Sequence, residues 1–129
     1  MDRSDESFFL NSKFVTELTP TDFEQVATWK LKDKSCSVVF MYCGWCGYCV
    51  SAKDEWEKFA MTAAFIKVYA FNCEKYKMHV DVIKNDMPGL INGYPTIVFY
   101  KQGKPIETFG DERTKSNFLK ASMRVCKQK

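Results

Sequence analysis

The sequence contains no apolar run close to the roughly 20 residues that a helix needs to cross a bilayer, so no membrane segment is expected. It also contains no block of like charge, because its 19 basic and 16 acidic residues are scattered and leave a net charge of +3. Nucleic-acid grooves need clustered basic side chains, so no nucleic-acid partner is expected. Internal repeats, low-complexity tracts and linkers are missing too, which favours a single domain.

Targeting signals are missing at both ends of the sequence. The start, MDRSDESFFLNS, is acidic and polar where a signal peptide has a basic end and an apolar middle. The end, VCKQK, has no retrieval signal of the KDEL type. We therefore expect a cytoplasmic, reducing compartment, where cysteines are more often catalytic, metal-bound or free than structurally bridged. The endoplasmic reticulum and a virion stay open as alternatives.

Apolar residues are plentiful. The chain has 129 residues, of which 46% are hydrophobic and 16% aromatic, enough to bury the core of one globular domain. We expect an N-terminal extension over residues 1–12 and one domain over residues 13–129. A monomer is the expected state, and a dimer is the alternative.

Strand-like and helix-like segments alternate along the chain. β-branched and aromatic runs predict strands at residues 13–18, 37–42 and 65–72. Apolar residues at intervals of three or four, and a capping box in the first case, predict helices at residues 21–30, 49–63 and 76–86. TIVFY and IETF, joined by KQGKP, predict an antiparallel hairpin, and Thr114 begins a final helix. The result is an α/β domain whose mixed central sheet has helices on both faces.

Three of the six cysteines are spaced three residues apart in CGWCGYC, residues 43–49. The run resembles the start of an iron–sulfur motif, but Lys53 stands at the fourth ligand position and Asp54 at the following proline. A zinc site would need a fourth ligand from a distant cysteine or from His79. We therefore expect no metal and no organic cofactor, and keep a three-cysteine metalloprotein as a minor alternative.

A redox pair accounts for the spacing better. Cys46 would end the loop after the strand at 37–42, and Cys49 would follow one helical turn later, close enough to form a disulfide. The helix N-terminus stabilises a thiolate, so the pKa of Cys46 is expected to fall from about 8.5 toward 7 or below. Cys46 would then attack a substrate disulfide, and Cys49 would resolve the mixed disulfide.

WCGYC, followed by AKDEWEKFA and by GYPT at residues 93–96, resembles a thioredoxin-fold domain, and most of all the catalytic domains of protein disulfide isomerases. The resemblance extends from about Lys13 to Cys126. It implies a thioredoxin fold and a thiol–disulfide oxidoreductase that acts on protein or peptide cysteines. A separate electron donor or acceptor would recycle the pair.

The same resemblance implies roles for residues outside the cysteine motif. The family's proline in this motif is cis and faces the two cysteines, so Tyr94 and Pro95 would hold an extended substrate, with Trp45 beside them. Arg113, in FGDERTKSNFLKA, matches an arginine that eases deprotonation of the resolving cysteine. The alternative for Arg113 is a solvated residue that caps a loop.

Several positions depart from the family pattern. The family's buried acid is replaced by Phe40, and the lysine that pairs with it falls near Ala70. Proton transfer would then use water or Arg113. Tyr48 replaces the histidine common in isomerases, so we expect a reduction potential between roughly −270 and −180 mV, and reductase and isomerase roles both stay open. The missing acid slightly favours the main alternative, a non-catalytic peptide-binding module.

The remaining cysteines have less specific interpretations. Cys43 is expected to be a small packing residue, with an extra resolving thiol as the alternative. Cys73 is expected to be a free buried thiol. Cys36 and Cys126 are expected to be free or to pair between molecules. His79 is expected on the surface.

Overall fold

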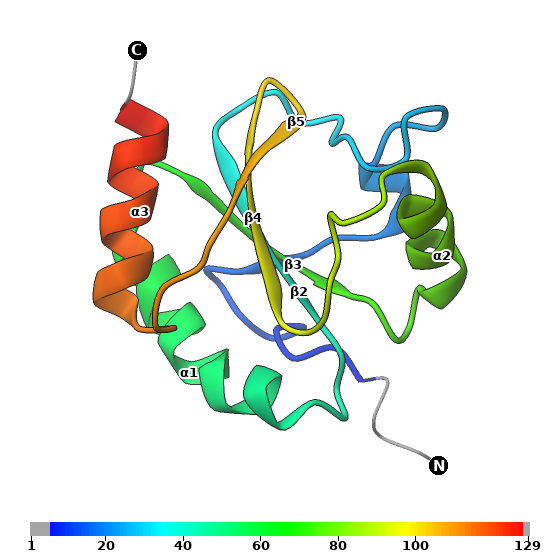
Figure 1. Cartoon of the computed structure of the whole chain (residues 1–129). Helices are drawn as coiled ribbons and strands as arrows, with labels where there is room; N and C mark the ends of the chain where they lie inside the picture. The colour runs from blue at the N-terminus through cyan, green and yellow to red at the C-terminus, as the bar shows by residue number, and fades with distance from the viewer. Residues whose placement is uncertain (1–5, 128–129) are drawn as a thin grey trace.

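A five-stranded mixed sheet lies at the centre of the computed structural model, which describes residues 6–127 (Figure 1). The strands are β1 (Thr16–Glu17), β2 (Ser37–Tyr42), β3 (Lys67–Asn72), β4 (Thr96–Lys101) and β5 (Lys104–Thr108). Their order in the sheet is β1-β3-β2-β4-β5; β1, β3 and β2 are parallel, and β4 is antiparallel to both of its neighbours.

Helices cover both faces of this sheet. They are the 3-10 helix η1 (Pro20–Asp22) and the α-helices α1 (Gly47–Thr62), α2 (Lys77–Asp86) and α3 (Lys115–Lys127). Helices α1 and α3 lie on one face and α2 lies on the other (Figure 1). The expected mixed sheet, closing hairpin and C-terminal helix are confirmed. Among the described residues, no helix combines the length and apolarity that a bilayer crossing needs.

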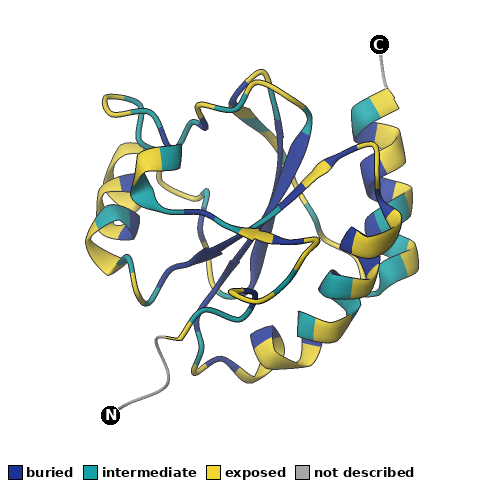
Figure 2. Cartoon of the chain, turned by 180° about the vertical axis from the view of Figure 1, so that it is seen from behind, coloured by how far each residue is buried: buried dark blue, intermediate teal, exposed yellow. Residues whose placement is uncertain are grey.

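Strand β2 runs through the middle of the molecule, and all six of its residues are buried. It pairs in parallel with β3 and antiparallel with β4, so neither edge is free. The continuous apolar run SVVFMY suits this position, since both faces of the strand are covered. Figure 2 shows buried residues concentrated on the strands and exposed ones on the outer sides of the helices.

Helix α1 packs against β2 through aromatic side chains. The fully buried ring of Trp56 lies 5.2 Å from that of Phe40 on β2 and 4.9 Å from that of Phe118 on α3. Burying one large apolar side chain stabilises a fold by about 1.5–3 kcal/mol. The packing therefore holds the N-terminus of α1 in place at the end of β2.

The helix expected at residues 21–30 is not present. The Asp22 carboxylate accepts a hydrogen bond from the Thr19 amide at 2.8 Å and caps only the short η1. Phe23 then pairs with Leu31 in an isolated antiparallel bridge, and the Leu31 amide donates to the Gly103 carbonyl at 2.9 Å. The backbone groups that a helix would use are bonded elsewhere, so this prediction was wrong.

The first strand is shorter than predicted. Only Thr16–Glu17 pairs with β3, instead of residues 13–18. The Ser12 hydroxyl accepts hydrogen bonds from the amides of Phe14 and Val15, each at 3.0 Å. These amides are turned away from the sheet, so the strand begins later.

The segment that precedes β1 packs against the domain. Phe9 is 4% exposed, and the ring of Phe8 stacks on that of Tyr42 with centroids 4.2 Å apart. Leu10 stays 66% exposed. Residues 1–5 of the expected extension, and residues 128–129 of the expected domain, lie outside the described part of the chain.

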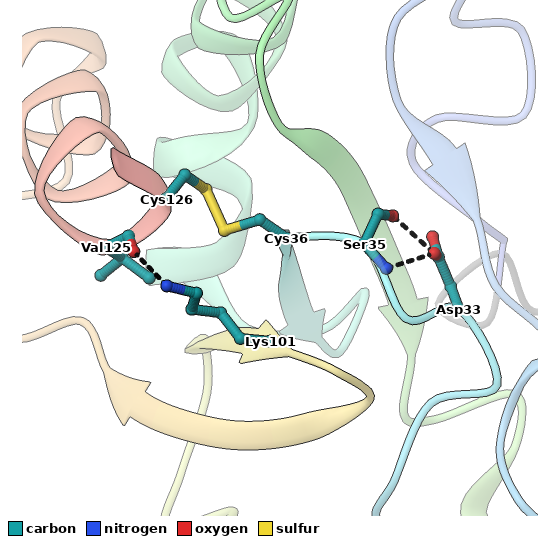
Figure 3. The surroundings of a disulfide bond; sticks show 6 residues. All are labelled: Asp33, Ser35, Cys36, Lys101, Val125 and Cys126. Carbon is teal, nitrogen blue, oxygen red and sulfur yellow. Dashed lines mark hydrogen bonds between the residues drawn. A yellow bond between two sulfur atoms is a disulfide. The ribbon is translucent and has the colours of Figure 1, made fainter. Parts of the chain in front are cut away.

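A disulfide joins Cys36, directly before β2, to Cys126 on the last turn of α3, with a Cα–Cα distance of 5.8 Å (Figure 3). Beside it, the Lys101 ammonium donates to the Val125 carbonyl at 3.1 Å. The expectation of free or intermolecular cysteines at these positions was wrong. The fold brings two residues separated by 90 positions together, which spacing in the sequence does not reveal.

Candidate active site

The two cysteines of the C-x-x-C motif lie where β2 passes into α1. Cys46 is the N-cap residue of α1, and its amide donates to the Cys43 carbonyl at 3.2 Å in the turn that begins the helix. Cys49 lies in the first turn and is fully buried, whereas Cys46 is 7% exposed. The Cys46 sulfur is therefore next to the free amides and positive dipole end of α1.

The loop before β4 approaches the same sulfur from the opposite side. The Cys46 thiol donates a hydrogen bond to the Tyr94 carbonyl at 3.3 Å. The Tyr94–Pro95 peptide bond is cis, and the Thr96 hydroxyl donates to the Gly93 carbonyl within the same loop. The structure thus brings Cys46, Tyr94 and Pro95 together from segments 48 residues apart.

Exposed aromatic side chains border Cys46. Trp45 is 63% exposed, and its ring meets that of Tyr94 edge to face, with centroids 6.3 Å apart. Tyr48 is 72% exposed, and the guanidinium of Arg113 lies 5.8 Å from the centre of its ring. Arg113 itself is exposed in the loop before α3. The structure therefore places it against the residue between the two cysteines.

The second cysteine of the motif is held protonated. Burial raises the pKa of Cys49 to about 12, although a hydrogen bond with the Cys43 backbone opposes this effect. At neutral pH the Cys49 sulfur is consequently a thiol and not a thiolate. Its proton must leave before it can act as a nucleophile.

The position of the family's buried acid lies inside the aromatic core. Phe40 is fully buried between the rings of Phe9 and Trp56, and Ala70 is its register partner on β3. No carboxylate stands at this position of the sheet. Phe40 and Ala70 therefore cannot relay a proton as the family's carboxylate does.

A half-buried carboxylate, Glu17 on β1, lies elsewhere in the domain, and the sequence pattern did not reveal it. One Glu17 oxygen accepts hydrogen bonds from the Tyr42 hydroxyl at 2.7 Å and from the Phe9 amide at 3.0 Å. Burial raises the pKa of Glu17 despite these bonds. Glu17 and Tyr42 are 25 positions apart, so only the order of the strands brings them together.

Other residues considered as ligands are placed differently. Within residues 6–127, no three His, Cys, Asp or Glu side chains are grouped so that they could hold a metal ion. His79 is half-buried against the rings of Phe23 and Phe71, and burial lowers its pKa. The expectation of a surface histidine was therefore wrong, because the loop that replaced the first predicted helix covers it.

Comparison with known proteins agrees with this geometry. A family model described as Thioredoxin matches residues 14–124. The chain is 30% identical over 125 residues to the protein disulfide-isomerase A6 homolog of Drosophila melanogaster, covering 95% of this chain and 27% of that protein. It is 29% identical over 124 residues to a putative protein disulfide-isomerase of Dictyostelium discoideum, covering 90% of this chain and 28% of that protein. The chain thus spans little more than a quarter of the length of these relatives.

Solved structures show the same fold. The J-Trx1 fragment of ERdj5 matches with a TM-score of 0.77 at 20% identity, covering 98% of this chain and 58% of that one. The Trx4 domain of ERdj5 matches with a TM-score of 0.66 at 21% identity, covering 84% of this chain and 91% of that one. The fold, the cysteine motif and the family model agree over most of the chain. The chain belongs to the thioredoxin family and is close to the domains of protein disulfide isomerases.

Proposed function

We propose that the protein is a thiol–disulfide oxidoreductase that acts on the cysteines of proteins or peptides through Cys46 and Cys49. One observation carries the proposal. The Cys46 sulfur lies at the N-terminus of α1, 3.3 Å from the Tyr94 carbonyl, with the buried Cys49 thiol one turn further along the same helix. This is the arrangement that a nucleophilic and a resolving cysteine need.

The reaction proceeds by two exchanges. The Cys46 thiolate attacks one sulfur of a substrate disulfide, which forms a mixed disulfide and releases one substrate thiolate. Cys49 then loses its proton and attacks the Cys46 sulfur, which forms the Cys46–Cys49 disulfide and releases the second substrate thiolate. The released thiolates take up the protons, and the reverse sequence oxidises a substrate dithiol.

Deprotonation of Cys49 is the demanding step, since burial raises its pKa to about 12. The Arg113 guanidinium lies over Tyr48, the neighbour of Cys49 in the sequence. A positive charge close to the active site favours the thiolate form. We assign Arg113 the role of assisting this step, with water as the proton acceptor.

Substrate is held by the surface around Cys46. Trp45 offers a large exposed ring, and Tyr94 and Pro95 supply the loop that faces the sulfur. An extended peptide laid across this loop brings its own sulfur to Cys46, with backbone and apolar contacts on either side. The substrate class is therefore a polypeptide disulfide or dithiol, recycled by a separate redox partner.

The Cys36–Cys126 disulfide bears on the compartment. A bond between Cys36 and Cys126 persists in an oxidising environment and is rare in a reducing one. We therefore place the protein in an oxidising compartment such as the endoplasmic reticulum, in preference to the cytoplasm that the sequence analysis predicted.

Reduction of insulin by dithiothreitol tests the proposal. The protein should accelerate insulin precipitation, and Cys46→Ser should reduce the rate to that of dithiothreitol alone. Cys49→Ser should accumulate a mixed disulfide through Cys46, visible by mass spectrometry. Ser51→Ala, an exposed change on the same helix, is the matched control and should keep the wild-type rate.

The competing function is a peptide-binding module that does not use its thiols. The presence of Phe40 in place of a buried acid is the observation in its favour. An equal insulin rate for wild type and Cys46→Ser, together with peptide binding by both, would replace the oxidoreductase proposal with this one.

A further inference from the structure

Two buried thiols, Cys43 and Cys73, take no part in the reaction described above. Each directly follows a strand, Cys43 after β2 and Cys73 after β3. The last register pair of these parallel strands is Tyr42 with Asn72. The Cys73 amide donates to the Tyr42 carbonyl at 2.8 Å, so the alignment continues beyond the strand ends. Cys43 and Cys73 are therefore the next pair across the two strands.

This placement has the spacing of a disulfide. Neighbouring strands lie about 4.8 Å apart, and register partners point to the same face of a sheet. Disulfides join residues whose Cα atoms are about 4.4–6.8 Å apart. Both cysteines line one cavity of about 310 Å³ on the α2 face, together with Val80 and Lys84 of that helix and Tyr94. The two thiols consequently face the same space.

Tyr94 connects this cavity with the active site. Its side chain lines the cavity together with Cys43 and Cys73, while its carbonyl accepts the hydrogen bond from the Cys46 thiol. Cys43 also contacts the active pair through its backbone, because its carbonyl accepts a hydrogen bond from the Cys46 amide at 3.2 Å. The four sulfurs thus belong to one cluster at the ends of β2 and β3.

We propose that Cys43 and Cys73 form a second, internal dithiol–disulfide pair that exchanges with the Cys46–Cys49 disulfide. The exchange rests on the proposed function, which supplies the oxidised Cys46–Cys49 pair. The Cys43 thiolate attacks that disulfide at Cys49, forming a Cys43–Cys49 bond and releasing the Cys46 thiolate. The Cys73 thiolate then attacks Cys43, forming the Cys43–Cys73 bond and releasing the Cys49 thiolate. Protons lost by Cys43 and Cys73 pass to Cys46 and Cys49, and two electrons are transferred.

The internal pair gives the domain a capacity of four electrons instead of two. Burial raises the pKa of Cys43 to about 11, so at pH 7 only about one molecule in 10⁴ carries its thiolate. Internal exchange is therefore slow at neutral pH and accelerates as the pH rises. The active pair becomes reduced again without an external donor, at the expense of the inner pair.

The first arm of the test does not depend on the proposed function. The Cys46→Ser/Cys49→Ser double variant is incubated with excess oxidised glutathione, alkylated, digested and mapped by mass spectrometry. The expected result is a peptide linked through Cys43 and Cys73. Adding Cys73→Ser to this variant is the matched control and should leave no such linkage. Alkylated Cys43 and Cys73 in the double variant, under conditions that oxidise the wild-type active pair, would overturn the pairing.

The second arm uses the wild-type chain, so its main result does not depend on whether a variant folds. Fully reduced at its active site and oxidised with excess diamide, it should lose four alkylatable thiols, against two in Cys73→Ser. A stable two-thiol end point in wild type would overturn the exchange. A linked Cys43–Cys73 peptide without insulin reduction would refute the proposed function but not the pairing, so the two failures are distinguishable.

Discussion

Removal of the Cys36–Cys126 disulfide should lower the stability of the domain by an amount that the topology predicts. The bond closes a loop of 90 residues, which corresponds to about 4.6 kcal/mol at 25 °C when the lost entropy of the unfolded chain is counted. Helix α3 keeps other contacts in the Cys36→Ser/Cys126→Ser variant, because Phe118 and Val125 are each 1% exposed and Lys101 still bonds to the Val125 carbonyl. The effect therefore arises mainly in the unfolded state.

Urea unfolding followed by tryptophan fluorescence measures this loss. With a slope of about 2 kcal/mol per molar, the midpoint should fall by roughly 2 M. Dithiothreitol would also reduce the active pair and the proposed Cys43–Cys73 pair, so its effect is measured in a Cys46→Ser/Cys49→Ser/Cys73→Ser background. There, adding it should reproduce the shift. An unchanged midpoint in both experiments would refute the reasoning, because it would mean that the bond does not constrain the unfolded chain.

Three further substitutions test single features of the fold and its pH dependence. Gly103→Ala should destabilise the domain by more than about 1 kcal/mol, because the φ of Gly103 is +79° and a Cβ there would lie 2.5 Å from the Leu31 carbonyl oxygen. Gly110→Ala is the control, since Gly110 has open space around it. Equal urea midpoints for the two variants would contradict the argument. Phe118→Ala should cost about 4 kcal/mol in urea unfolding, since it empties a fully buried site between α1 and α3; a loss below 1 kcal/mol would mean that the helices do not pack there. Burial raises the folded-state pKa of Glu17 above its ordinary 4.5. The contribution of Glu17 to the stability of the fold is therefore fully present below pH 4.5, and it is lost as the pH rises through the folded-state pKa. Glu17→Gln should remove this decline from urea midpoints measured between pH 4 and pH 8, and parallel curves for the two proteins would show that the carboxyl does not titrate in this range.

Much of the fold could be predicted from the sequence because its signals are local. The continuous apolar run of β2, the apolar periodicity of α1 and the Thr114 cap of α3 all involve residues within one or two turns of each other. The prediction failed at residues 21–30, where a good local helix signal competes with a distant partner. The Leu31 amide bonds to Gly103, and an isolated sequence does not show that this acceptor is near.

In the candidate active site, too, some features could be predicted from the local sequence and others could not. The C-x-x-C motif at a strand-to-helix junction is a local pattern, and it is enough to predict Cys46 and Cys49 as the candidate pair. The contact between the Cys46 thiol and the Tyr94 carbonyl was expected only through the resemblance to a family. Glu17 was overlooked altogether, since nothing near it in the sequence marks it as the partner of Tyr42.

Spacing and periodicity of neighbouring residues were thus enough to predict most of the elements, the α/β class and the candidate pair Cys46 and Cys49. The neighbours of the other four cysteines depended on which strands and helices lie side by side. The order β1-β3-β2-β4-β5 aligns Cys43 with Cys73 at the ends of two parallel strands, and the docking of α3 brings Cys126 to Cys36. Such contacts join residues tens of positions apart, and they form only when burial of the whole core has placed the strands and helices against one another.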